Sequence, residues 1–372
     1  MLDNHIVPGH YDEKDGYLFP MNTIVSLKMY YQSQLEEVAT NYDKIVQDLA
    51  CEVDRYHTYD DIVNLKTIND SCGTDSQLLI SDNLFDLISL GIDLTKITKG
   101  AFNLAMGSLI DLYAPYFDED SPGLTKSLPS KILIDEALLG VPSYEKIDEV
   151  IELDKQKKTI KLNKINNHNV IISLGAIAKG YVMQKAYDYL KQNNYPCIID
   201  AGSSTMATLG NNPLRKDKNW LIGFQKPLIN QDSSLLCTIS TKDDTFISTS
   251  GDYRLNFFYQ DENNKLKLMH HIIDSKTGVS NNYTRSVTLV SHDTNLAILD
   301  ALSTALFNIE NQADVAALFE VVNSKYNSNI DYLISRPYQN SFNEFELTMN
   351  KNFKDFVTTE FDDSIKKINI ID

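Results

Sequence analysis

The chain of 372 residues carries 34 Lys and Arg against 51 Asp and Glu, which gives a net charge of −17 at pH 7. A surface that binds nucleic-acid phosphates needs clustered positive charge, so this balance argues against broad nucleic-acid binding. Hydrophobic residues make up 42% and charged residues 23%, as in ordinary globular proteins, which excludes long disorder, collagen-like chains and coiled coils. The length allows two domains, or one large domain with two sublobes.

The ends of the chain and its cysteines bear on where the protein acts. The first residues have neither a basic flank nor an apolar run, and no stretch approaches the ~18 apolar residues of a membrane span. The four cysteines lie far apart without C-x-x-C spacing, which favours free thiols over a zinc site or a redox pair. We therefore expect a cytoplasmic protein with no membrane span, although a chain trimmed of its export signal would look the same.

In chain order, the first elements are a strand, two helices and a loop. Residues 24–30 mix β-branched and aromatic side chains, which favours a strand. Ser33 and Glu36 form a capping box at the start of an amphipathic helix, and a second helix is predicted over 81–94. Prolines, a glycine and acidic residues over 114–131 indicate a surface loop or an insertion between sublobes.

Strands dominate the remainder of the chain. A Lys-Gln-Lys turn between two apolar runs predicts a β-hairpin over 150–162. Helices predicted over 177–192 and 294–309 interrupt the strands without the regular alternation of a doubly wound sheet. Further strands are predicted over 169–174, 197–201, 205–209, 220–225, 235–240, 246–250, 266–274 and 286–291. The pattern favours an α+β fold, with mainly antiparallel sheets flanked by helices.

The apolar run 170–174 turns through Gly175 and enters a helix that contains Lys179. The N-terminus of a helix offers unpaired N–H groups and partial positive charge, and Lys179 adds a full charge, so a phosphate group fits there. A plain strand-to-helix turn with a solvated lysine would give the same pattern. Neither the Walker lysine motif nor G-x-G-x-x-G is present to decide between them.

The apolar helix predicted over 294–309 is interrupted by Asp300, Ser303 and Thr304. Spacings of three and four place these oxygens on one helical face, and a buried carboxylate without a partner is costly. A hard cation such as Mg²⁺ accepts carboxylate, hydroxyl and carbonyl oxygens, so a magnesium site is one interpretation. A carboxylate bonded to neighbouring backbone donors is the other.

The segment around His271 combines a strand end with a turn. Asp274 and Thr277 suit Asx-type turn bonding before Gly278. His271 is either a packed imidazole or a group of a functional site, because an isolated histidine does not distinguish the two.

Several motifs in the same order resemble those of the ApbE-type FAD:protein FMN transferases. They are Met21-Asn-Thr23, Thr98-Lys-Gly-Ala-Phe102, Gly175-Ala-Ile-Ala-Lys-Gly-Tyr181, Asp200-Ala-Gly-Ser-Ser204, Trp220-Leu-Ile-Gly223, Thr249-Ser-Gly-Asp-Tyr253, His271-Ile-Ile-Asp274 and Asp300-Ala-Leu-Ser-Thr304. The resemblance implies a T-fold-related architecture with the flavin site between two sublobes. It further implies an enzyme that cleaves FAD and links FMN to a Thr or Ser of an acceptor flavoprotein, releasing AMP.

The resemblance also implies roles for individual residues. The metal ion would be held by the Ala176 carbonyl, Asp300, Ser303 and Thr304. The flavin nucleotide would contact Met21, the Tyr56 region, Ala101, Phe102, Asn103, Ser173, Lys179, His271 and Ile272. Mg²⁺ and Lys179 would neutralise phosphate charge, and His271 would take the proton of the acceptor hydroxyl, with Asp274 as a second candidate or an orienting partner.

This chain departs from the family pattern at five positions. Asn103 and Ser173 stand where family members commonly carry aspartate, Ser203 and Ser204 replace a Gly-Gly pair, and Ser275 replaces a proline. These changes leave two alternatives open. One is a metal-dependent FAD pyrophosphatase, in which water replaces the acceptor hydroxyl, and the other is a degenerate homologue that binds flavin without turnover.

Domain limits follow the same comparison. We expect an N-terminal extension over 1–20, an ApbE-like domain over 21–345 with the possible insertion at 114–131, and a peripheral C-terminal segment over 346–372.

Overall fold

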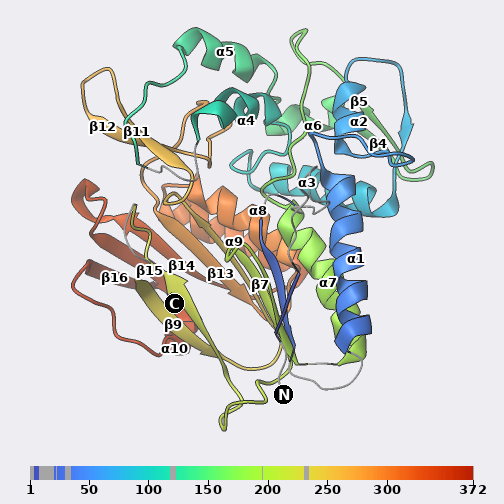
Figure 1. Cartoon of the computed structure of the whole chain (residues 1–372). Helices are drawn as coiled ribbons and strands as arrows, with labels where there is room; N and C mark the ends of the chain where they lie inside the picture. The colour runs from blue at the N-terminus through green and yellow to red at the C-terminus, as the bar shows by residue number, and fades with distance from the viewer. Residues whose placement is uncertain are drawn as a thin grey trace.

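A nine-stranded sheet forms the centre of the computed structural model, which describes residues 4–7, 21, 23–29, 35–117, 123–194, 196–229 and 234–371 (Figure 1). The strand order is β1-β2-β6-β7-β10-β13-β14-β15-β16, and every pair is antiparallel except β15 and β16. The bounds are β1 (Asn4–Val7), β2 (Val25–Met29), β6 (Cys197–Ala201), β7 (Thr205–Leu209), β10 (Thr245–Gly251), β13 (Ser286–Ser291), β14 (Ile330–Pro337), β15 (Phe345–Asn350) and β16 (Ile365–Ile371).

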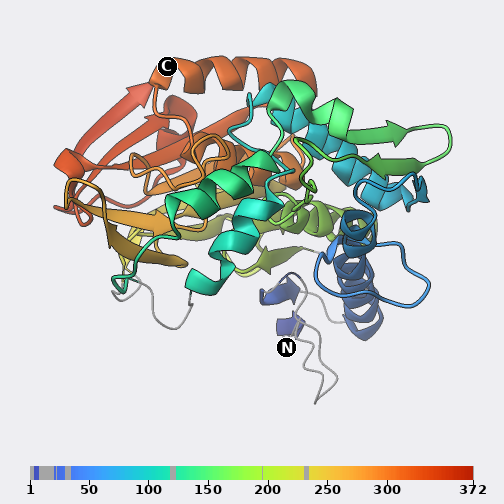
Figure 2. The ribbon, with the colours of Figure 1, turned by 90° about the horizontal axis from the view of Figure 1, so that it is seen from above.

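Smaller sheets and the helices surround this sheet, and Figure 2 shows the teal helices beside the orange strands. The smaller sheets comprise β3 (Leu78–Leu79), β4 (Ile151–Asp154), β5 (Thr159–Leu162), β8 (Trp220–Gln225), β9 (Leu235–Thr241), β11 (Asn256–Gln260) and β12 (Leu266–His270). The helices are α1 (Leu35–Val53), α2 (Leu65–Asp70), α3 (Asp82–Ile97), α4 (Gly107–Tyr113), α5 (Lys131–Leu139), α6 (Ile147–Val150), α7 (Ala178–Asn193), α8 (Leu296–Phe307), α9 (Gln312–Tyr326) and α10 (Lys351–Phe356).

The two faces of the main sheet pack against different layers. On β10, Phe246 belongs to the large apolar cluster with α7 and α8, whereas Ile247 belongs to the cluster with the β8–β9 hairpin and α10. Successive side chains of a strand point to opposite faces, so Ser248 and Ser250 share the face of Phe246. The strand therefore directs two hydroxyls toward α8.

A third apolar cluster builds a smaller sublobe from α4, α5, β11 and β12. Leu109, Tyr113, Ile134, Phe257 and Met269 form most of its buried core. Because β12 ends at His270, His271 is the first residue after the last strand of this sublobe. The α+β class with antiparallel sheets and flanking helices agrees with the sequence prediction.

Residues 169–174, predicted as a strand, form no strand in the structure. Their backbone groups bond to loops and side chains instead: Ser173 donates its N–H to the Leu104 carbonyl at 2.8 Å, and Ile172 donates to Asn69 Oδ1 at 2.8 Å. The apolar pattern reported burial correctly, since Ile172 and Leu174 are buried. It could not indicate that a side chain and a loop, and not a neighbouring strand, would bond to the backbone of this segment.

The C-terminal segment over 346–372, predicted as peripheral, contributes to the core. β15 lies between β14 and β16, and Leu347, Met349 and Phe353 are fully buried in the cluster under the β8–β9 hairpin. The loop over 358–364 and β16, at the edge of the sheet, are largely exposed. The Asn- and Lys-rich composition led to the wrong prediction, because it gave no sign that β15 pairs with a strand on each side.

Three further predictions differ from the structure or fall outside its described part. The strand predicted over 266–274 ends at His270. The capping box at Ser33 lies outside the described residues, and the predicted insertion 114–131 is described only to 117 and again from 123. There Lys126 donates its N–H to the Phe258 carbonyl at 2.8 Å, so this segment joins the sublobe beside β11.

The chain as described also bears on the membrane and cysteine predictions. No helix within the described residues is both long and apolar enough to cross a bilayer. All four cysteines are free thiols, as the sequence spacing indicated, and three of them are buried.

A buried ion pair joins the end of β10 to the start of β13. Arg285 donates from Nε to Asp252, and its other nitrogens donate to the Pro227 and Phe342 carbonyls at 2.9 Å each. Asp252 and Arg285 are 2% and 1% exposed. Burial raises the pKa of Asp252 to about 6, although the Arg285 guanidinium favours the ionised carboxylate.

We expect Asp252→Asn to lower the free energy of unfolding by about 3–5 kcal/mol, because it leaves the buried Arg285 charge without a counter-ion. Urea unfolding followed by circular dichroism measures the effect. The matched control is Asp135→Asn, which breaks the exposed Lys131–Asp135 pair and should cost less than about 1 kcal/mol. Equal losses in both variants would contradict a special role for the buried pair.

Candidate functional site

The start of α7 approaches α8 closely because residue 180 is glycine. A Cβ atom on Gly180 would lie 2.3 Å from the Leu296 carbonyl oxygen, so any other residue would force the two helices apart. This approach lets the Gly180 N–H donate to Asp300 Oδ2 at 2.6 Å. The predicted phosphate turn and the predicted metal helix are thereby brought together.

Asp300 is a buried carboxylate, 5% exposed, without an ion-pair partner among the described residues. Thr205 donates from Oγ1 to both carboxylate oxygens, at 2.8 and 3.1 Å. Burial raises the pKa of Asp300 to about 6, although the Lys179 charge and the donors from Ser248, Thr205 and Gly180 favour its ionised form. A backbone donor, the Gly180 N–H, thus contacts the carboxylate, as the second sequence interpretation expected. The magnesium interpretation stays a prediction.

Hydroxyl groups from α8 and β10 meet beside this carboxylate. Ser303 Oγ lies 3.2 Å from Ser248 Oγ and 2.7 Å from Ser250 Oγ, and it donates to the Asp300 carbonyl at 3.0 Å. A hydroxyl makes about three hydrogen bonds, so these partners fill the capacity of Ser303. Thr304 Oγ1 has a longer contact, 3.4 Å to Ser250 Oγ, and its side chain is half-buried.

This donor set consists of oxygen atoms only. Carboxylate, hydroxyl and backbone carbonyl oxygens suit a hard divalent cation, and a buried carboxylate without an ion-pair partner would gain most from it. No group of three or more His, Cys, Asp or Glu side chains in the described chain could hold a metal. A cation here would therefore depend on Asp300, hydroxyls, the neighbouring Ala176 turn, water and ligand phosphate.

Lys179 lies in the first turn of α7 and points to the loop after β6. Its Nζ donates to Ser204 Oγ at 2.6 Å, and Ser204 donates in turn to the Ala201 carbonyl at 3.1 Å. Burial raises the pKa of the nearby Asp200, while the Ser203 N–H and Lys179 act in the opposite direction. The Lys179 ammonium group is thus held beside the turn by Ser204 and is not free in solvent.

His271 follows directly after β12 and has an exposed side chain. Its backbone N–H donates to the Leu255 carbonyl at 3.1 Å. Desolvation by the surrounding protein and then the Lys179 charge lower the pKa of His271 to about 4. Water contact at an exposed ring weakens this desolvation, and the Lys179 charge still holds the pKa below its ordinary value, so the imidazole is mainly neutral at pH 7 and able to accept a proton.

Asp274 has a structural role in the turn after His271. Its Oδ1 accepts the Lys276 N–H at 2.9 Å, its carbonyl accepts the Gly278 N–H at 2.9 Å, and Asn281 contacts Oδ2 at 3.5 Å. These are the bonds of the predicted Asx-type turn. Among the described residues no hydrogen bond joins Asp274 to the His271 ring.

The loop from Thr98 to Asn103 lies against the His271 turn. Ser275 donates from Oγ to the Gly100 carbonyl at 2.8 Å, a bond that proline at this position could not make. Phe102 is buried, and Asn103 uses both ends of its amide, donating to the Pro142 carbonyl and accepting the Ala105 N–H, at 2.9 Å each. An aspartate at 103 could not donate to Pro142 in this way.

The other predicted flavin contacts lie on several segments. Ser173 and Ile272 are buried, and Ala101 is half-buried. Met21 packs at the margin of the large apolar cluster. Tyr56 is 55% exposed, and its described contacts are the Asp54 carboxylate, which accepts its N–H, and the Arg55 guanidinium over its ring.

Several groups near Asp300 were not predicted. Thr205, Ser248 and Ser250 are the hydroxyls that surround the α8 face, and Ser204 contacts Lys179. The signal available in the sequence was the spacing of Ser248 and Ser250 at i and i+2 within a predicted strand. That spacing indicates two hydroxyls on one buried face.

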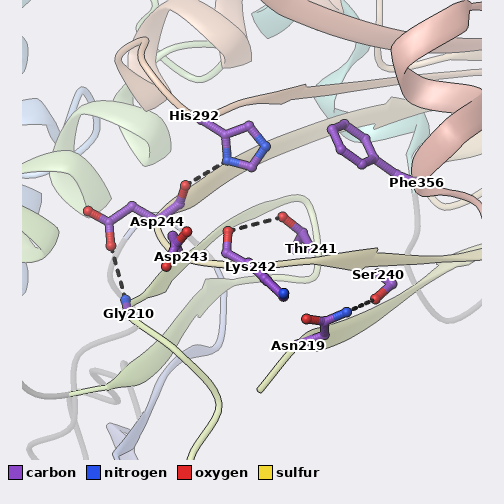
Figure 3. A pocket seen from close by; sticks show the side chains of 9 residues that line it. All are labelled: Gly210, Asn219, Ser240, Thr241, Lys242, Asp243, Asp244, His292 and Phe356. Carbon is purple, nitrogen blue, oxygen red and sulfur yellow. Dashed lines mark hydrogen bonds between the residues drawn. The ribbon is translucent and has the colours of Figure 1, made fainter. Parts of the chain in front are cut away.

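A hollow of about 730 Å³ opens at the other end of β7 and β10 (Figure 3). Its polar groups largely satisfy one another: Asp244 accepts the Gly210 N–H at 3.0 Å, its carbonyl lies 2.8 Å from His292 Nδ1, and Asn219 donates to Ser240 at 2.8 Å. None of the predicted site residues lines it. We therefore do not assign the site to this hollow.

The sequence is similar to a known protein family and to several of its members. The model of the ApbE family matches residues 21–325. A FAD:protein FMN transferase of Klebsiella pneumoniae is 29% identical over 249 residues, which is 64% of this chain and 66% of that relative, just under two thirds of its length. A protein of the same name from Haemophilus influenzae is 25% identical over 278 residues, covering 73% of this chain and 72% of the relative.

Solved structures support the fold. The ApbE protein of Thermotoga maritima superposes with a TM-score of 0.71 at 20% identity, covering 96% of this chain and 100% of its own. The flavin transferase ApbE of Vibrio cholerae gives 0.68 at 22% identity, covering 90% and 96%. At these identities the structures establish the fold alone, and the family model covers most of the sequence. The chain belongs to the ApbE family.

Proposed function

We propose that this protein is an FAD:protein FMN transferase that acts with Mg²⁺ on a Thr or Ser hydroxyl of an acceptor flavoprotein and releases AMP. The observation that carries the proposal is the junction of α7 and α8. There a buried, poorly compensated Asp300 carboxylate lies one hydrogen bond from the helix turn that bears Lys179. The names of the relatives support the same activity.

The Mg²⁺ ligands would be Asp300, Thr304 and the Ala176 carbonyl, with water and phosphate oxygens completing the shell. Ser303, which the sequence comparison also assigned to the ion, would instead support this set, because its hydroxyl already has three oxygen partners. Bound there, Mg²⁺ would draw charge from the phosphate oxygens of FAD. Lys179 would neutralise further phosphate charge from the first turn of α7.

The flavin nucleotide would occupy the space between the two sublobes. Ala101, Phe102 and Asn103 would contribute from the loop after α3, Ser173 from the segment before α7, and Ile272 from the turn after β12. Met21 and Tyr56 would complete the contacts. The described bonds of Asn103 support a role in shaping the loop rather than in contacting the nucleotide with its amide.

In the reaction, the acceptor hydroxyl oxygen forms a bond to the FMN phosphorus, and the bond from that phosphorus to the bridging oxygen of FAD breaks. AMP leaves with the bridging oxygen. His271 would accept the hydroxyl proton, since its exposed, neutral ring is available at pH 7. The remaining work of the protein is to align the attacking and leaving oxygens and to compensate charge.

The test is incubation of the protein with FAD, Mg²⁺ and candidate acceptor flavoproteins, followed by mass spectrometry of the acceptor and measurement of AMP. An added FMN on Thr or Ser, with one AMP per FMN, is the expected result. AMP and free FMN without acceptor labelling would indicate the pyrophosphatase alternative. FAD binding without AMP under any condition would indicate a flavin-binding homologue.

A further inference from the structure

Asn308, which ends α8, bonds to three separate segments of the chain. Its Nδ2 donates to the Ala101 carbonyl at 3.1 Å and to the Ile273 carbonyl at 3.4 Å. Its Oδ1 accepts from Asn281 Nδ2 at 3.1 Å. One amide side chain therefore connects three segments to the end of α8: the loop over 98–103, called the flavin loop below, the His271 turn over 271–275, and the segment after that turn.

The position of Asn308 on its helix relates these contacts to the proposed metal site. Asp300, Thr304 and Asn308 follow one another at intervals of four residues, so they lie along one face of α8. At a rise of about 1.5 Å per residue, the carboxylate and the amide are separated by about 12 Å along the axis. A rigid helix thus sets the distance between the proposed metal site and the loops of the flavin side.

The two loops are also joined directly. Ser275 Oγ donates to the Gly100 carbonyl at 2.8 Å, one residue before the carbonyl that Asn308 contacts. The Ser275 bond fixes the loops to each other, whereas the Asn308 bonds fix both loops to α8. Only the second set relates His271 to Asp300.

We propose that Asn308 is a positioning residue, which holds the flavin loop and the His271 turn in register with the helix that bears Asp300. The inference rests on the proposed function for its catalytic consequence. In-line phosphoryl transfer depends on the placement of the base and of the phosphate, and a misplacement of about 1 Å can cost about 10²-fold in rate. The amide suits the task because it supplies two N–H donors and one acceptor, whereas a carboxylate would oppose two carbonyls.

The helix end does not depend on this side chain. The Asn308 backbone N–H donates to the Ala305 and Leu306 carbonyls, so the cap remains when the amide is removed. Asn308→Ala should consequently fold. Asn311→Ala is the control for loss of an asparagine side chain at a nearby helix end, because Asn311 accepts the Ala313 N–H at the start of α9 and has no described contact with the predicted site residues.

The experiment compares the wild type, Asn308→Ala, Asn308→Asp and Asn311→Ala. We expect both Asn308 variants to lower the turnover number for FMN transfer about 10- to 100-fold, with the FAD dissociation constant changed less than about threefold. Hydrogen exchange should quicken in 98–103 and 271–275 of the Asn308 variants and stay at the wild-type rate in both segments of Asn311→Ala.

Each outcome decides one proposal. Unchanged exchange in both segments of Asn308→Ala would overturn the positioning role whatever the activity. Equal loss of turnover in the Asn308→Ala and Asn311→Ala variants would also overturn it, since the effect would then be general destabilisation. A wild-type protein that labels no acceptor and releases no AMP would overturn the proposed function instead, and the exchange measurement would still test the connection between the loops and α8.

Discussion

Asp300→Asn is expected to lower Mg²⁺-dependent AMP release and FMN transfer by about 10³-fold. The substitution preserves the shape of the side chain but removes the only charge that the α8 face offers to a divalent cation among the described residues. It also places an amide N–H against the Gly180 N–H or the Thr205 hydroxyl, which both donate to the carboxylate. Loss of several kcal/mol of transition-state stabilisation corresponds to that factor.

Binding and activity should be measured separately for this variant. Titration with Mn²⁺, followed by electron paramagnetic resonance, reports metal affinity without turnover, and AMP release reports the reaction. The matched control is Asp331→Asn on β14, which removes another buried carboxylate whose pKa is raised by burial and which accepts from Asn350. If Asp300→Asn binds Mn²⁺ like the wild type, or if Asp331→Asn loses as much activity, the proposed metal site is wrong.

Thr304→Val, which replaces a hydroxyl by a methyl group, tests the same site from a second position. Its described contact with Ser250 is long, 3.4 Å, so removal of the hydroxyl should change stability little. A large rise in the Mg²⁺ concentration needed for half-maximal activity would then assign the hydroxyl to the ion.

The α8 face was predictable because one helix carries all of it. An apolar run interrupted by polar residues three and four apart fixes a face by helical geometry alone, and the structure has the helix over Leu296–Phe307. Lys179 was placed at the start of α7 from another local pattern, an apolar run that turns through Gly175 and enters a helix. Both predictions needed only patterns within one short stretch of sequence.

Contacts between distant segments could not be derived in this way. The hydroxyls of Ser248 and Ser250 meet Ser303 only because β10 packs against α8, more than 50 residues away in sequence. Asn308 likewise joins a loop that lies 207 residues upstream. Single-sequence periodicity contains no information about such pairs, and an asparagine at a helix end is common for local capping reasons.

The segment over 169–174 shows the limit of the apolar pattern. A continuous apolar run indicates burial, yet it does not specify what satisfies the backbone. Here the Asn69 amide exchanges two bonds with Ile172, donating to its carbonyl at 2.9 Å and accepting its N–H at 2.8 Å. One side chain substitutes for a strand neighbour, which no property of the run itself could indicate.

His271→Ala should slow FMN transfer about 10²- to 10⁴-fold while the FAD dissociation constant changes much less, because a general base acts only in the reaction step. The ring is exposed and neutral at pH 7, and surrounding protein and Lys179 keep its pKa below the ordinary value. Protonation of His271 therefore should not reduce transfer between pH 6 and pH 8. Single-turnover labelling of the acceptor measures the step directly.

Chemical rescue distinguishes a base from a packing residue at this position. Because the side chain is exposed and follows the end of β12, its removal leaves a space that solvent can reach, and added imidazole should restore part of the lost rate. The neighbouring His270 is the contrast: it is fully buried, its Nε2 lies 2.7 Å from the Asn281 carbonyl, and burial lowers its pKa to about 3. His270→Ala should therefore lower stability through the lost packing and resist rescue. If imidazole rescued neither variant, and if His271→Ala lost FAD affinity in proportion to its rate, His271 would be a binding residue and the acceptor proton would have to leave by another route.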